Sequence, residues 1–205
     1  MQILLKDKLK SYMFVLIFGL IMGVMAGLTA NLPGDDLWSV GYLGTGAYGF
    51  WMCSTSIIVL SSDKRKTAVI NTALYVISMF FITAVFRSAH SYLVSYAVRE
   101  APYSLFHHLF MDGAWKWYLG YIFEGETIFA IIASAILYFG RKENLPGKIM
   151  RYLPLCYLIF ECCVFTIQIF TLKRMVIPVC VDLICITVYI LFLKNNFKKT
   201  NLYKS

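Results

Sequence analysis

Four carboxylates lie inside apolar stretches of this sequence, where a charged side chain is costly. They are Glu124, Glu126, Glu161 and Asp182. A carboxylate at the centre of a lipid-facing helix costs about 2.5–3.5 kcal/mol, so such residues face a bundle interior or a water-filled cavity. All four are expected in the outer half of the bilayer. We therefore predict a polar cavity, open to the outside, that binds a cation, a proton or a polar solute.

Helical periodicity indicates which polar side chains share a surface. Glu161 lies on one helix face with Tyr157 and Gln168, at spacings of four and seven residues. Glu124 and Glu126 are two residues apart and point to nearly opposite faces, so only one of them is expected to join a shared cavity. The predicted binding set therefore joins the four carboxylates with the Gln168 amide and the Arg87 side chain.

A structural role for the same acids is the alternative. Glu161 and Asp182 can form hydrogen bonds between helices or pair with the cationic side chains Arg87 and Lys116. For Glu161 the binding and structural roles are equally well supported by the sequence. Asp182 and Glu124 lie nearer the membrane surface, where the structural role is favoured.

A second polar set lies in the stretch 87–113, which we expect outside the membrane. His108 and Asp112 are four residues apart, and the same stretch contains His90, Glu100 and His107. Such groups can bind a divalent metal, and a membrane-embedded enzyme that uses them is one alternative function. Their spacing lacks the tight form of a metalloprotease helix, and the six cysteines form no CxxC pair. We therefore expect neither metal nor cofactor.

One glycine motif has no role in nucleotide binding. Residues 44–49, Gly-Thr-Gly-Ala-Tyr-Gly, match GxGxxG literally. The motif binds dinucleotides only after a strand in a βαβ unit, and here it lies in an apolar segment. We interpret it as a close-packing or flexible part of a helix.

The elements that must position these residues are membrane-spanning helices. The chain has 205 residues, of which 60% are apolar and 15% charged, whereas soluble domains have about 45–50% and about 25%. Continuous apolar runs near the roughly 20 residues that cross a bilayer favour helices over a barrel. We predict one all-α bundle over residues 1–205, without internal repeats, and six spans. They are 11–30, 38–60, 67–86, 115–139, 149–171 and 175–193.

The distribution of positive charge predicts the orientation. With the N-terminus inside, 14 Lys and Arg residues are cytoplasmic and 5 are outside, which follows the positive-inside rule. Both termini are therefore predicted in the cytoplasm. The net charge of +8 lies at the ends of apolar runs, so we expect no nucleic-acid binding. Short loops and lysine-rich cytoplasmic ends favour a bacterial cytoplasmic membrane.

Small residues mark a packing face on the first helix. Gly19, Gly23 and Gly27 recur every four residues, so a neighbouring helix can approach closely. Packing inside the bundle is the favoured interpretation, and a partner subunit or a second copy is the alternative. Six helices with this face resemble the substrate-binding S components of energy-coupling factor transporters. The resemblance implies that the first helix packs on a transmembrane coupling subunit.

The leading hypothesis is a non-enzymatic membrane protein that binds or translocates a small solute or cation, as a subunit of a larger transporter or alone. The alternatives are the membrane-embedded enzyme described above and a scaffold, sensor or immunity-type partner without a ligand.

Overall fold

The computed structural model describes residues 2–45, 47–97, 104–122 and 126–197, and within these ranges it contains helices and no strand. The prediction of an all-α fold is confirmed for this part of the chain. The elements are α1 (Gln2–Thr29), α2 (Tyr42–Thr45), α3 (Gly49–Ser61), α4 (Arg65–Ala97), η1 (His107–Met111), α5 (Ala114–Ile122), α6 (Ile128–Leu137), η3 (Tyr138–Arg141), α7 (Leu145–Leu172) and α8 (Val176–Phe197).

Four helices are long and apolar enough to cross a membrane: α1 from Ser11 onward, α4, α7 and α8. They correspond to the predicted spans 11–30, 67–86, 149–171 and 175–193. The helix α4 is longer than predicted, because it continues through Arg87 and His90 to Ala97. No glycine or proline occurs in that extension, so the sequence offers the helix no stop signal there.

The predicted span 38–60 is not one continuous helix, and the predicted span 115–139 is described on either side of residues 123–125. The stretch 38–60 contains a loop, the short α2 and the 13-residue α3, and the stretch 115–139 contains α5, α6 and part of η3. Glycines at positions 41, 44, 46 and 49 accompany the first division, and glycine is a poor helix former. Between α5 and α6, residues 123–125 lie outside the described residues.

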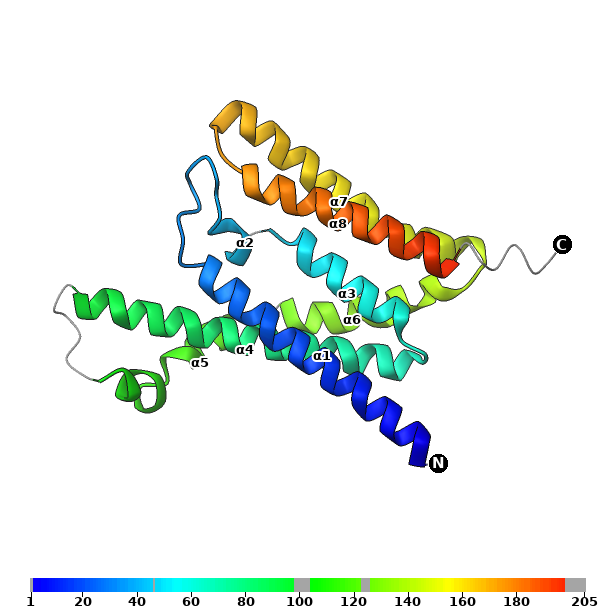
Figure 1. Cartoon of the computed structure of the whole chain (residues 1–205), viewed down its shortest axis with the longest axis horizontal. Helices are drawn as coiled ribbons and strands as arrows, with labels where there is room; N and C mark the ends of the chain where they lie inside the picture. The colour runs from blue at the N-terminus through cyan, green and yellow to red at the C-terminus, as the bar shows by residue number, and fades with distance from the viewer. Residues whose placement is uncertain (1, 46, 98–103, 123–125, 198–205) are drawn as a thin grey trace.

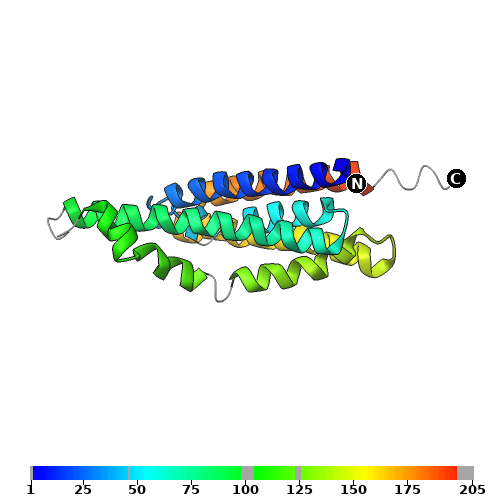
Figure 2. The same ribbon diagram turned by 90° about the horizontal axis from the view of Figure 1, so that it is seen from below.

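The long helices run along a common axis (Figures 1 and 2). In Figure 1, α3 lies between the α7–α8 pair and the helices α1 and α4. Two clusters of buried side chains match this arrangement. One joins α3 to α7 and α8 around Leu158 and Tyr189, and the other joins α1 to α4 around Val15 and Tyr75. The start of α1 and the end of α8 lie at the same end of the bundle.

The glycine face of α1 packs on α4. A Cβ atom at Gly19, Gly23 or Gly27 would clash with atoms of α4, at Tyr75, Ser78, Met79, Ile82 and Phe86. The Thr83 hydroxyl adds a hydrogen bond of 3.2 Å to the Gly23 carbonyl oxygen. This face is filled within the chain, so a docked partner subunit would need another surface.

The loop before α2 holds the start of α8. The backbone N–H groups of Val176 and Ile177 donate to the carbonyl oxygens of Leu37 and Trp38, at 3.2 Å each. The first N–H groups of a helix have no partner inside it, so this loop satisfies them. The buried Ser39 hydroxyl also accepts from the Met175 N–H at 3.1 Å.

The start of α7 is fixed by a capping side chain and by a buried arginine. The Asn144 side chain caps α7 by accepting from the Gly147 N–H at 3.0 Å. One turn later, Arg151 donates to the carbonyl oxygens of Gly140 and Lys142 at 2.8 and 2.7 Å. These contacts tie α7 to η3.

Candidate functional site

Glu161 lies in the middle of α7, and its side chain reaches the start of α3. Its side chain is 6% exposed. Its Oε1 atom accepts a hydrogen bond of 2.9 Å from the backbone N–H of Tyr48 and one of 3.4 Å from the Tyr157 hydroxyl, one turn earlier on α7. The carboxylate therefore binds backbone from a segment more than one hundred positions earlier in the chain.

The start of α3 is suited to this carboxylate. Tyr48 is the N-cap residue of α3, but no side chain of α3 itself caps the helix. The free N–H groups of a helix start carry partial positive charge and favour an anion. Glu161 supplies from α7 the negatively charged acceptor that a local Ser or Asp cap usually provides.

Asp182 of α8 joins Glu161 at the same place. Its side chain is 1% exposed. A Cβ atom built on Gly49 would clash with both Glu161 Oε2 and Asp182 Oδ1, and it would touch Leu158. Both carboxylates thus lie against the one residue at the start of α3 that has no side chain. We refer to Glu161 and Asp182 as the acid pair.

Each member of the acid pair has an oxygen atom without a partner. Glu161 Oε2 and Asp182 Oδ2 are buried and accept no hydrogen bond from the residues that the structure describes. Buried polar atoms normally have a partner, so each exception needs an explanation. Two carboxylates in a shared buried site also repel each other, and a bound cation or proton removes that repulsion. The arrangement can hold a positive charge between α7 and α8.

Glu126 lies at the outside of the same region. The Tyr48 hydroxyl donates a hydrogen bond of 3.3 Å to Glu126 Oε1, and both side chains are exposed. Tyr48 therefore contacts Glu161 through its backbone and Glu126 through its side chain. Glu124 lies outside the described residues.

The remaining predicted binding residues are Gln168 and Arg87. Gln168 is partly buried on α7 and lies two turns beyond Glu161, roughly 10 Å along the helix. Its Oε1 atom has no hydrogen bond from the described residues. Arg87 is a partly buried residue of α4. The described residues that contact Glu161 are instead Tyr48, Gly49 and Tyr157.

The external histidines form a small cluster at Asp112. His107 Nε2 lies 3.2 Å from Asp112 Oδ1, and His108 Nδ1 lies 3.9 Å from Asp112 Oδ2. His90 is an exposed residue of α4, and Glu100 lies outside the described residues. In the described ranges no group of three or more His, Cys, Asp and Glu side chains is placed to hold a metal ion.

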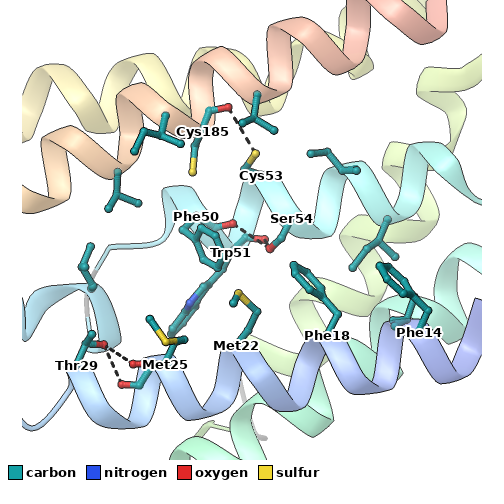
Figure 3. A pocket seen from close by; sticks show the side chains of 18 residues that line it. Phe14, Phe18, Met22, Met25, Thr29, Phe50, Trp51, Cys53, Ser54 and Cys185 are labelled. Carbon is teal, nitrogen blue, oxygen red and sulfur yellow. Dashed lines mark hydrogen bonds between the residues drawn. The ribbon is translucent and has the colours of Figure 1, made fainter.

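An apolar groove runs beside the acid pair, between α1, α3 and α8 (Figure 3). Its volume is about 550 Å³. Phe14, Phe18, Met22 and Met25 form the α1 wall, as Figure 3 shows. Opposite them, the Cys53 thiol contacts the Cys185 carbonyl oxygen at 3.6 Å. The groove is lined by hydrocarbon, sulfur and aromatic groups, so it differs in chemistry from the acid pair.

Tyr48 and Gly49 are site residues that sequence reasoning missed. The signal was present in the glycine motif at residues 44–49, which we interpreted as close packing. Gly44 does pack closely, because its Cβ would clash with Ala26 and Ala30 of the α1 end. Gly49 makes the corresponding close approach to the acid pair.

Comparison with family models, with curated proteins and with solved structures finds no match for this chain.

Proposed function

We propose that this chain is a six-span membrane protein that binds and translocates a small cation or polar solute at the acid pair. One observation carries the proposal: Glu161 and Asp182 are both buried against Gly49, and each has an oxygen atom, Oε2 and Oδ2, without a geometric hydrogen bond from the part of the chain that the structure describes. The four span-length apolar helices support the membrane setting.

The energetic argument is that the acid pair is incompletely compensated. Glu161 is stabilised by the backbone N–H groups of Tyr48 and Gly49 and by the Tyr157 hydroxyl, but Asp182 Oδ2 accepts no hydrogen bond from the described residues. Acidic residues kept inside membrane bundles commonly mark ion and proton pathways, because each is costly in the absence of a partner. A positive charge bound between the two carboxylates offsets that cost, whereas an apolar ligand does not.

The divided helices support a transport role. In many transporters the substrate site is formed where a membrane-spanning helix is interrupted, near the middle of the bilayer. Here the start of α3 meets the acid pair, and Tyr48 also contacts Glu126, just before α6. In this proposal α2 with α3 and α5 with α6 complete the second and fourth crossings. The Lys and Arg distribution supports both termini on the cytoplasmic side, and a bacterial cytoplasmic membrane is part of the same proposal.

The test is protection of the acid pair by cations. Purified protein is treated with a hydrophobic carbodiimide, which modifies buried carboxyl groups, with and without sodium, potassium or lithium chloride. Mass spectrometry locates the modified residues. We expect a cation to slow modification of Glu161 and Asp182 in the wild-type protein, and protection of each to be lost when the other is neutralised by Glu161→Gln or Asp182→Asn.

The matched control is Asp35→Asn, because Asp35 is an exposed carboxylate in the loop before α2. This variant should keep full protection at the acid pair. Equal modification of the wild-type acid pair with and without every cation would contradict binding of an inorganic cation there. Unchanged protection in both neutralised variants would remove the acid pair as its site.

A further inference from the structure

Four side chains linked to the acid pair form a series of increasing exposure. Asp182 is 1% exposed and Glu161 6%, whereas Tyr48 is 40% exposed and Glu126 is an exposed side chain. The order along the contacts is Asp182, Glu161, Tyr48 and Glu126. A ligand that reaches the acid pair from water meets Glu126 and Tyr48 first along this series.

We propose that Glu126 and Tyr48 form a cation-selective approach to the acid pair, so the ligand is a small inorganic cation or proton that enters between the start of α3 and the start of α6. This inference rests on the proposed function. It assigns a role to Tyr48 and Glu126, gives a route to the acid pair and narrows the class of ligand.

Charge selects the ligand on this route. The acid pair and Glu126 are carboxylates, and among the described residues the side chains that act on the acid pair are Tyr48, Tyr157 and the two acids themselves, together with the backbone N–H groups of Tyr48 and Gly49. None of these side chains carries a positive charge. A passage lined by one sign of charge with apolar walls concentrates ions of the opposite sign. It therefore favours cations over anions.

The Tyr48 side chain is held in place by aromatic packing. Its ring packs edge-on against Trp51 with centroids 5.6 Å apart, and Trp51 packs against Phe80 of α4 at 5.4 Å. Its hydroxyl group donates to Glu126 Oε1. A cation at Glu126 competes with that hydroxyl for the same oxygen atom. Binding at the outer carboxylate thus loosens the contact that joins the two side chains.

The experiment measures which reagents reach the approach. Single cysteines are placed at the two positions, as Tyr48→Cys and Glu126→Cys, in a chain whose six natural cysteines are replaced. Reconstituted protein is treated separately with three methanethiosulfonates of similar size, one cationic, one anionic and one neutral. The rates at which they modify each cysteine are compared. We expect the cationic reagent to react about tenfold faster than the anionic one at both positions, the lower end of electrostatic focusing.

Two controls separate the approach from general membrane effects. Ser104→Cys is an exposed position after α4, and its cationic-to-anionic ratio should be much smaller. Adding Glu161→Gln and Asp182→Asn should reduce the ratio at Tyr48→Cys, because the charge behind it is removed.

The outcomes distinguish the approach from the binding site. Equal rates for cationic and anionic reagents at both cysteines, or no reaction with any reagent, overturn the approach even if cations protect the acid pair. A cationic preference without cation protection at the acid pair supports the route but contradicts the proposed function. If Tyr48→Cys fails to fold, Glu126→Cys alone decides, because its side chain is exposed.

Discussion

The backbone N–H of Tyr48 donates a 2.9 Å hydrogen bond to Oε1 of Glu161. One bond thereby links the beginning of a short helix to the centre of a long one. It satisfies an N–H that α3 cannot satisfy itself, and it fixes the carboxylate beside Gly49. The same contact that completes the fold therefore also sets the geometry of the proposed site.

Gly49→Ala should destabilise the protein. The added methyl group would clash with both carboxylates of the acid pair, and overpacking of this kind costs about 1–3 kcal/mol. We expect a lower midpoint of thermal unfolding in detergent, followed by circular dichroism, together with loss of cation protection at the acid pair.

Gly120→Ala is the control for that change, because a Cβ atom at Gly120 of α5 meets nothing within 4 Å. It should leave the midpoint unchanged or raise it slightly, since alanine favours helix. Equal midpoints for both variants would show that Gly49 does not make a close approach.

Gly23→Leu should separate α1 from α4. The leucine side chain has no space, because even a Cβ atom would clash with the Met79 carbonyl oxygen and the Ile82 side chain. We expect the two helices to lose their contact, so that a disulfide between cysteines introduced across them no longer forms on mild oxidation. Ile21→Leu, at an exposed position of the same helix, should leave cross-linking intact. Efficient cross-linking in Gly23→Leu would contradict the packing.

Arg151→Lys should lower stability although charge is kept. Arg151 donates from two guanidinium nitrogens to the carbonyl oxygens of Gly140 and Lys142. The single ammonium group of lysine cannot reproduce both hydrogen bonds in that geometry. A buried acceptor left without a partner costs about 1–3 kcal/mol. Denaturant or thermal unfolding of Arg151→Lys against Lys148→Ala, an exposed neighbour, measures the difference. A midpoint for Arg151→Lys that equals the control would argue against this role.

Labelling from one side of the membrane tests the six crossings. In the cysteine-free chain, Asp35→Cys and Ser104→Cys should react with an impermeant maleimide applied to intact cells. Asp63→Cys and Asn195→Cys should react only after the membrane is opened. All four positions are exposed in the structure. Labelling of Asp63→Cys in intact cells would contradict the proposed orientation, and labelling of Asn195→Cys would place the C-terminal end outside.

The sequence was informative about which residues share a depth. Apolar runs predicted α1, α4, α7 and α8, because a continuous hydrophobic segment carries its own length signal. The positions of Glu161 and Asp182 within their apolar runs also predicted a similar depth in the membrane for both, and the structure brings them together at Gly49. Helical periodicity put Gln168 on the face of Glu161, but two turns of helix separate them.

The divided helices could not be predicted in the same way. Residues 38–60 contain no charged side chain, so a division of the sequence at charged clusters does not register the interruption between α2 and α3. The partner that stabilises the interruption, Glu161, lies far away in the sequence. For the same reason Tyr48 was not recognised, because its role depends on a backbone N–H that a continuous helix would have used internally.

The packing of α1 on α4 has a consequence for biosynthesis. The glycines of α1 fit a helix that is synthesised only after α2 and α3 have been made. Until α4 is inserted, the glycine face of α1 has no helix to pack against. Lipid or a chaperone must then cover Gly19, Gly23 and Gly27. The folding of this bundle is therefore not a simple sequence of adjacent hairpins, and pauses in translation before residue 97 should leave the nascent chain open to degradation.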